Sequence, residues 1–111
     1  MTWQLAGFGD EISAHLNEQL AVLADEGIRL LDLRAVWDKN VLTLTDDELD
    51  TIARALRQRS MRVGCVASPI GKVAIDADFD AHLADFRRIL EIARRVAAPY
   101  VRVFSFFLPA A

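Results

Sequence analysis

Apolar and polar residues recur with two different periods along this chain, and these periods predict strands that alternate with helices. Short apolar runs at residues 3–8, 28–34, 61–67 and 100–104 have the length and composition of buried strands. Between these runs, apolar side chains return every three or four residues, as they do on one face of a helix. The predicted order of elements is therefore β-α-β-α-β-α-β.

The first helical segment shows both its periodicity and its expected ends. Leu16, Leu20 and Leu23 fall on one face, at spacings of four and three residues. Ser13 is a candidate N-cap, and Gly27 stands where a left-handed residue would end the helix. The sequence predicts a helix between these two residues.

The second and third helical segments are bounded by other local signals. Residues 45–48 read Thr-Asp-Asp-Glu, the pattern of a capping box at the start of a helix. The third segment carries an apolar stripe over residues 79–97 and is followed by Pro99, which cannot continue a helix. We therefore expect three helices, the last ending near Pro99.

This order and spacing predict an α/β domain built from parallel βα repeats. Strand starts lie roughly 25 to 40 residues apart, which suits right-handed crossovers between parallel strands. Such crossovers place the carboxyl ends of all strands on one edge, which is where ligand sites of sheets and barrels of this kind lie. At 111 residues the chain has room for one core, so we treat it as a single domain or part of one.

Composition and charge exclude several classes of function. The chain is 53% hydrophobic and 26% charged with a net charge of −3, which favours a globular protein and gives no broad positive face for nucleic acid. It shows no apolar run long enough for a membrane span and no signal-peptide pattern, so we expect no membrane partner and a cytoplasmic location. Cys65 is the single cysteine, so no internal disulfide can form.

Polar residues follow each predicted strand, but they do not form a known phosphate-binding fingerprint. A Walker loop would need glycine in place of Val66 and serine or threonine in place of Val73. A dinucleotide fingerprint would need its third glycine where Ile12 stands. Neither ATP nor NAD is indicated, although Lys72 offers a positive charge to an anionic or polyhydroxy ligand.

Several charged residues at the strands admit more than one interpretation. Asp10 and Glu11 can bind a cation, accept hydrogen bonds from sugar hydroxyls or cap the next helix, and capping is the simplest account. Asp32 and Arg34 share a strand face, which is typical of an interior ion pair or of a small network that could include Arg102. Equally, a position at the strand ends would make Arg34 a ligand-orienting donor.

Histidines supply no catalytic arrangement in this sequence. His15 and His82 fall in or beside the predicted helices, away from the strand ends, so we expect both on helix surfaces. No Ser-His-Asp or Cys-His set can be assembled, and we assign no catalytic residue.

Four motif blocks resemble one known family. They are GFGDEIS at 7–13, LDLRAVWDKNV at 31–41, SPIGKV at 68–73 and YVRVFSFF at 100–107. As a set they resemble the sugar phosphate isomerase/epimerase family of xylose isomerase-like TIM barrels, although that family more often has glutamate at the position of Asp32. The resemblance implies that residues 1–111 are the amino-terminal half of such a (β/α)₈ barrel, with about four strands and three helices.

The same resemblance implies a site for a sugar or polyol, without the metal centre. Complete members bind a divalent cation, Mn²⁺ or Mg²⁺, and move a proton between neighbouring carbons, with metal ligands mainly from the second half of the barrel. This chain would therefore hold no cofactor. The residues that the resemblance places on the substrate-facing side are Glu11, Arg34, Trp37, Asn40, Ser68 and Lys72, with Trp37 as an apolar wall for the sugar ring.

These expectations lead to one leading hypothesis and two rivals. The leading hypothesis is a truncated isomerase/epimerase-like domain that is inactive alone, because the catalytic half is missing. The first rival is a homodimer of half-barrels, joined through exposed sheet edges, that binds a small carbohydrate or acidic metabolite without catalysis. The second is a free-standing flavodoxin-like or Rossmann-like interaction domain, which would have helices on both faces of an open sheet.

Overall fold

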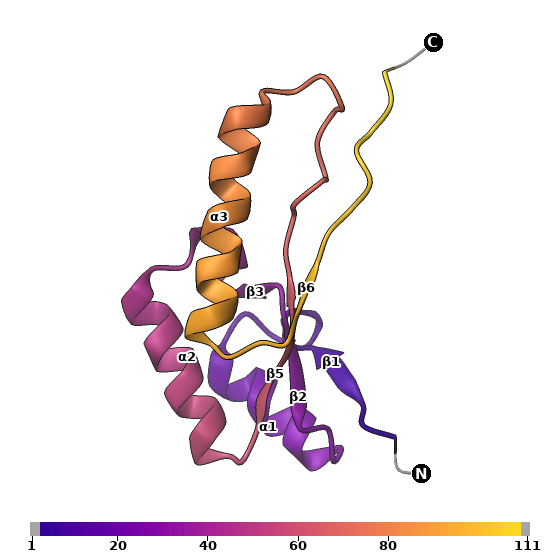
Figure 1. The fold of residues 1–111 in the computed structure, drawn as a ribbon. Helices are drawn as coiled ribbons and strands as arrows, with labels where there is room; N and C mark the ends of the chain where they lie inside the picture. Colours follow the sequence, from indigo (N-terminus) through magenta and orange to yellow (C-terminus); the bar gives the residue numbers. More distant parts are fainter. Residues whose placement is uncertain (1–2, 110–111) are drawn as a thin grey trace.

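The computed structural model describes residues 3–109 and shows an α/β fold with one parallel sheet (Figure 1). The sheet contains β1 (Ala6–Phe8), β2 (Leu30–Leu33), β5 (Arg62–Ala67) and β6 (Tyr100–Arg102), in the order β1-β2-β5-β6. The helices are α1 (Leu16–Asp25), α2 (Asp46–Gln58) and α3 (Phe79–Arg95). The predicted α/β class, with a four-stranded parallel sheet and three helices, is confirmed.

Short elements connect the strands to the helices. A 3₁₀ turn, η1 (Gly9–Glu11), follows β1. The antiparallel hairpin of β3 (Ala35–Val36) and β4 (Lys39–Asn40) follows β2 and leads into a second 3₁₀ turn, η2 (Val41–Thr43). This hairpin was not predicted from the sequence.

The core lies on one side of the sheet. Leu31 and Leu33 of β2 are buried, whereas their neighbours Leu30 and Asp32 point to the other face and remain half-buried. A single cluster of buried side chains joins the sheet to all three helices. This one-sided arrangement contradicts the doubly wound sheet considered as the second rival, because that fold needs helices on both faces.

The helix ends confirm two of the predicted signals and correct two others. The Thr45 capping box is present, and Gly27 has a φ of 76° just after α1. His15 takes the N-cap position of α1 instead of Ser13, whose Oγ accepts a hydrogen bond from the His15 N–H. Helix α3 ends before Pro99, since Ala97 adopts a left-handed φ of 55°.

Two extended segments run side by side beyond the sheet, and we call them the arm (Figure 1). The arm consists of residues 70–75, which follow β5, and residues 103–107, which follow β6. Phe104 N donates to Ile70 O at 2.7 Å, and Phe107 N donates to Val73 O at 2.9 Å. Residues far apart in the sequence thereby extend the β5–β6 pairing.

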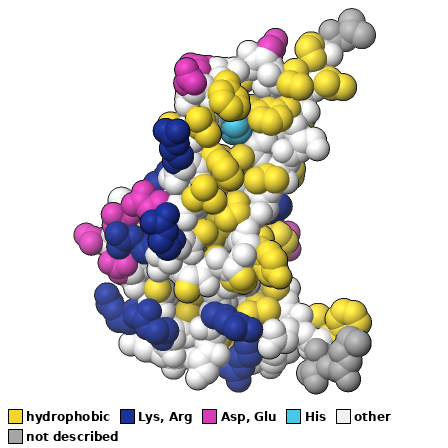
Figure 2. Space-filling model, viewed as in Figure 1, with side chains coloured by type: hydrophobic (Ala, Val, Ile, Leu, Met, Phe, Trp, Pro, Cys, Tyr) yellow, Lys and Arg dark blue, Asp and Glu magenta, His cyan; other side chains and the backbone are white. Residues whose placement is uncertain are grey.

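Large apolar side chains are exposed along the arm and at the two edges of the sheet. Figure 2 shows apolar side chains gathered over the part of the molecule where α3 and the arm lie in the same view. Among all described residues, the large apolar side chains with the highest exposure are Trp3, Leu5, Phe79, Tyr100, Val103 and Leu108. No helix in residues 3–109 is both long and apolar enough to cross a bilayer.

Candidate functional site

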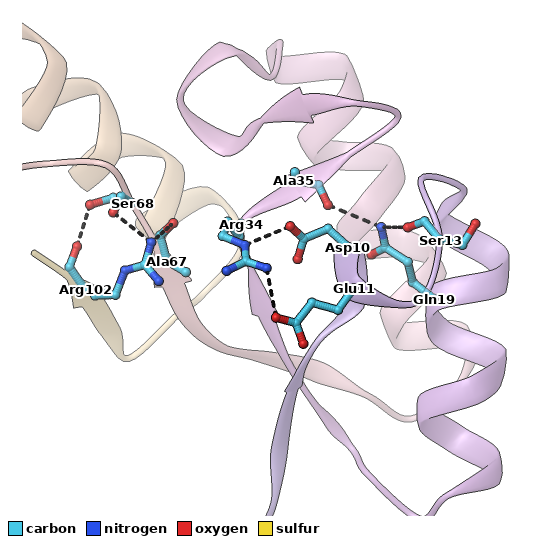
Figure 3. Close-up of polar contacts among 9 residues, drawn as sticks. All are labelled: Asp10, Glu11, Ser13, Gln19, Arg34, Ala35, Ala67, Ser68 and Arg102. Carbon is cyan, nitrogen blue, oxygen red and sulfur yellow. Dashed lines mark hydrogen bonds and ion pairs between the residues drawn. The ribbon is translucent and has the colours of Figure 1, made fainter. Parts of the chain in front are cut away.

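An acidic turn and an arginine meet at the carboxyl ends of β1 and β2 (Figure 3). Asp10 and Glu11 lie in η1, directly after β1, and Arg34 follows β2. Arg34 Nε lies 2.8 Å from Asp10 Oδ2, and Arg34 Nη2 lies 3.4 Å from Glu11 Oε1. The bond to Asp10 is the main reason why the pKa of Arg34 is raised, so this guanidinium remains charged.

A second polar cluster lies at the ends of β5 and β6. Ser68 is buried; its Oγ donates to Arg102 O and accepts a hydrogen bond from Ile70 N at 3.2 Å. Arg102 Nη2 donates to the carbonyl oxygens of Ala67 and Ser68, both at 3.3 Å. These bonds hold the start of the β5–α3 loop against β6, as Figure 3 shows.

Aromatic rings connect the two clusters on the face of the sheet away from the helices. The Arg34 guanidinium lies 4.4 Å from the centroid of the Phe8 ring, and that of Arg102 lies 5.9 Å from the same ring. Arg102 is also 4.5 Å from the Phe104 ring, which Lys72 Nζ approaches to 5.6 Å. A cation over the face of an aromatic ring is attracted by the quadrupole of the ring. We call this connected set the strand-end network: Phe8, Asp10, Glu11, Arg34, Ser68, Lys72, Arg102 and Phe104.

The strand-end network contains four of the six residues that the resemblance suggested, and the other two lie elsewhere. Trp37 packs against the core and lines a cavity of about 350 Å³ between the start of α1 and one face of α2. Asn40 caps η2, since its Oδ1 accepts a hydrogen bond from Leu42 N. The structure therefore brings Glu11, Arg34, Ser68 and Lys72 into one network without Trp37 and Asn40.

A buried glutamine supports this site and was missed in the sequence. Gln19 of α1 is fully buried, and its Nε2 donates to the carbonyl oxygens of Ser13 and Ala35 (Figure 3). It thus ties the segment after η1 to the start of β3, close to Arg34. A glutamine within an otherwise apolar helix stripe was the available signal, since a buried amide needs partners.

His82 also differs from its prediction. Its Nε2 accepts a hydrogen bond from Gly71 N at 2.8 Å, so this histidine contacts the loop after β5 and is not a free residue on the surface of α3. Its ring lies 5.7 Å from that of Phe106 in an edge-to-face arrangement. His82 therefore joins α3 to both segments of the arm.

Asp32 lies on the same face as the network, in a poorly solvated position. Its Oδ1 is close to Gly64, and burial raises the pKa of the Asp32 carboxyl, while the charge of Arg102 opposes this shift. Burial, together with the nearby Asp32 charge, also raises the pKa of the Cys65 thiol. Asp32 has Arg102 as its electrostatic neighbour, whereas Arg34 is bonded to Asp10 and Glu11, so the expected pairing of Asp32 with Arg34 is wrong.

The raised pKa of Asp32 predicts a pH-dependent effect of the substitution Asp32→Asn. The folded state binds the Asp32 proton more tightly than the unfolded chain, whose carboxyl titrates near 3.8. Asp32 therefore contributes most to stability below that pH, and the contribution is lost as the pH rises through the folded pKa. Urea unfolding of both proteins should show the variant gaining stability relative to wild type between pH 4 and pH 7. A difference that stays constant or reverses would contradict the assignment.

Two buried polar atoms of the strand-end network have no hydrogen-bond partner within residues 3–109. They are Asp10 Oδ1, an acceptor, and Arg102 Nε, a donor. Buried polar atoms are normally satisfied by protein, water or ligand. Both atoms are buried, so an ordered water is their expected partner.

Residues 3–109 do not provide a metal centre. They contain no group of three or more histidine, cysteine, aspartate or glutamate side chains arranged to hold a metal ion. The carboxylates of Asp10 and Glu11 are instead bonded to Arg34. The described residues therefore do not fit the Mn²⁺ or Mg²⁺ that the family resemblance implies for complete members.

Comparison of the chain with protein-family models, with curated proteins and with solved structures gives no match. Function is therefore inferred from the strand-end network and from the motif blocks themselves.

Proposed function

We propose that this chain is the substrate-binding half of a (β/α)₈ barrel of the sugar phosphate isomerase/epimerase type, and that its strand-end network binds a sugar or related polyol. The observation that carries the proposal is the bonding of Arg34 to Asp10 and Glu11 at the carboxyl ends of adjacent parallel strands. Carboxylates and guanidinium groups held in this way present acceptors and donors to vicinal hydroxyls.

The charge of the network favours a ligand with many hydroxyl groups over a strongly anionic one. Asp10 and Glu11 are bonded to Arg34, and Asp32 lies near Arg102, which leaves Lys72 as an exposed positive group at one end.

The chain is expected to bind without catalysing. In complete members of the family, proton transfer next to a carbonyl uses a positioned base and a metal, and residues 3–109 do not fit the metal. Metal-assisted isomerisation would need groups from a second half-barrel. The second candidate function, a homodimeric half-barrel that only binds its ligand, is favoured by the apolar side chains exposed at the sheet edges.

Titration calorimetry with D-fructose and with D-fructose 6-phosphate tests the binding proposal. We expect weak binding, with a dissociation constant in roughly the millimolar range. Arg34→Ala should weaken it by about tenfold or more, because a hydrogen bond from a charged donor contributes about 1.5 kcal/mol or more. The matched control is Arg57→Ala, at an exposed arginine in the last turn of α2, which should bind as wild type does.

Two results would contradict this proposal. Equal loss of affinity in Arg34→Ala and Arg57→Ala would separate binding from the strand-end network. Turnover of either sugar by the isolated chain in the presence of Mn²⁺ or Mg²⁺ would show that a catalytic centre is present after all.

A further inference from the structure

The two outer strands of the sheet leave matching edges uncovered. β1 and β6 are the first and last strands in the order β1-β2-β5-β6, and all four strands are parallel. Exposed apolar side chains lie beside both edges, where Leu5 precedes β1 with 66% exposure and Val103 follows β6 with 56% exposure. An uncovered, apolar strand edge is a template for pairing with another strand.

The surface and the dimensions of the chain exceed those of a compact monomer. Its accessible surface is 7064 Å², whereas a folded monomer of 12.4 kDa exposes roughly 6,100 Å². Its radius of gyration is 14.9 Å, against about 13 Å expected for a compact domain of this length. The chain therefore exposes roughly 900 Å² more surface than a compact monomer of its mass.

From these observations we propose that two copies of this chain pair β1 of each copy with β6 of the other and close an eight-stranded parallel barrel. A two-fold axis along the barrel forms both junctions at once and keeps every strand parallel. Four strands from each copy give eight, the number of strands that closes a barrel filled by its own side chains. The inference depends on the half-barrel architecture proposed above, but not on ligand binding.

The sheet face that this assembly encloses carries balanced charges, so the same face of a second copy can lie opposite it. Arg34 is bonded to Asp10 and Glu11, and Arg102 lies near Asp32, so neither copy brings a large unbalanced charge to the interior. The side chains of Phe8 and Phe104 would become buried from solvent in the dimer. Closure would also bring the strand-end networks of both copies to one end of the barrel.

Sedimentation equilibrium of the 111-residue chain without ligand is the test. We expect a mass twice the 12.4 kDa of one chain at a concentration of roughly 100 µM, because interfaces of standard size have micromolar or tighter affinity. Leu5→Asp and Val103→Asp should each weaken dimerisation by about tenfold or more, since each places a charge at a strand junction. Val22→Asp is the matched control, at an exposed valine of α1.

The possible results of this experiment distinguish a closed barrel from other kinds of association. A dimer weakened at only one of the two edges would be an open pairing and would overturn the closed barrel. If Val22→Asp weakened the dimer as much as the edge variants do, the dimer interface would not be formed by the strand edges. If the wild type were monomeric, the strand edges would be available for pairing with a different chain. Either result would overturn the proposal without affecting the binding of sugars, which calorimetry measures separately.

Discussion

Replacing Gly71 by alanine is expected to destabilise the protein by about 3 kcal/mol or more. Gly71 has a φ of 84°, and a Cβ atom at this position would clash with the Phe104 carbonyl oxygen. The left-handed conformation alone costs an alanine about 1–2 kcal/mol. The clash adds to this cost, because backbone atoms can move apart only if the two segments of the arm separate.

Gly27→Ala provides a matched control for this prediction. Gly27 has a similar φ of 76°, but no heavy atom lies within 4 Å of the point that a Cβ would occupy, so we expect a loss of about 1 kcal/mol. Urea unfolding measures both losses, and amide hydrogen exchange at Phe104 and Phe107 reports the pairing of the arm. Equal losses in both variants, with unchanged exchange, would show that Gly71 is not required for that pairing.

Leu31→Ala is the second substitution for which we expect a large loss, of about 2–5 kcal/mol. Leu31 is 1% exposed and belongs to the single core between the sheet and the helices. Its neighbour Leu30 points to the other face and is only half-buried, so Leu30→Ala should cost about 1 kcal/mol or less. The two variants remove the same atoms from adjacent positions of one strand.

Unfolding of the two leucine variants should be measured at low protein concentration, where self-association does not contribute. A loss at Leu30 as large as that at Leu31 would show that both faces of the sheet are packed. That outcome would contradict the one-sided core.

The sequence predicted features that depend on local chemistry. Thr45 and Glu48 cap each other across one helical turn, and Gly27 needs only its own backbone freedom, so both signals could be recognised without knowledge of the fold. The parallel order of strands followed from the spacing of the apolar runs. The end of α3 was misplaced because Pro99 was visible in the sequence, whereas the left-handed Ala97 gave no such signal.

The partners within the site depended on contacts between distant residues, and these were only partly predicted. Arg34 was expected to share an ion pair with Asp32, two residues away on the same strand, but it is bonded to the turn after β1. The choice depends on how η1 lies against β2, which sequence spacing does not determine. The convergence of Glu11, Arg34, Ser68 and Lys72 was nevertheless accessible, because parallel strands bring their carboxyl ends to one edge.

The hairpin between β2 and α2 has no recognisable turn signal in the sequence. Its turn residues, Trp37 and Asp38, have φ angles of 56° and 60°, a conformation in which glycine or asparagine is expected. The N–H of Trp37 donates to Ala14 O at 2.7 Å, and its ring packs against the core. Tertiary contacts therefore support a turn that the local sequence does not favour.

The one-sided core also suggests an order of events during synthesis. The buried hydrophobic side chains of the described residues run from Leu16 to Val96, and β6 adds to this core only the partly buried Val101. The amino-terminal units can therefore assemble while later residues are still being translated. Strand β6 would then dock on a surface that is already folded, with His82 and Gly71 in place to receive it.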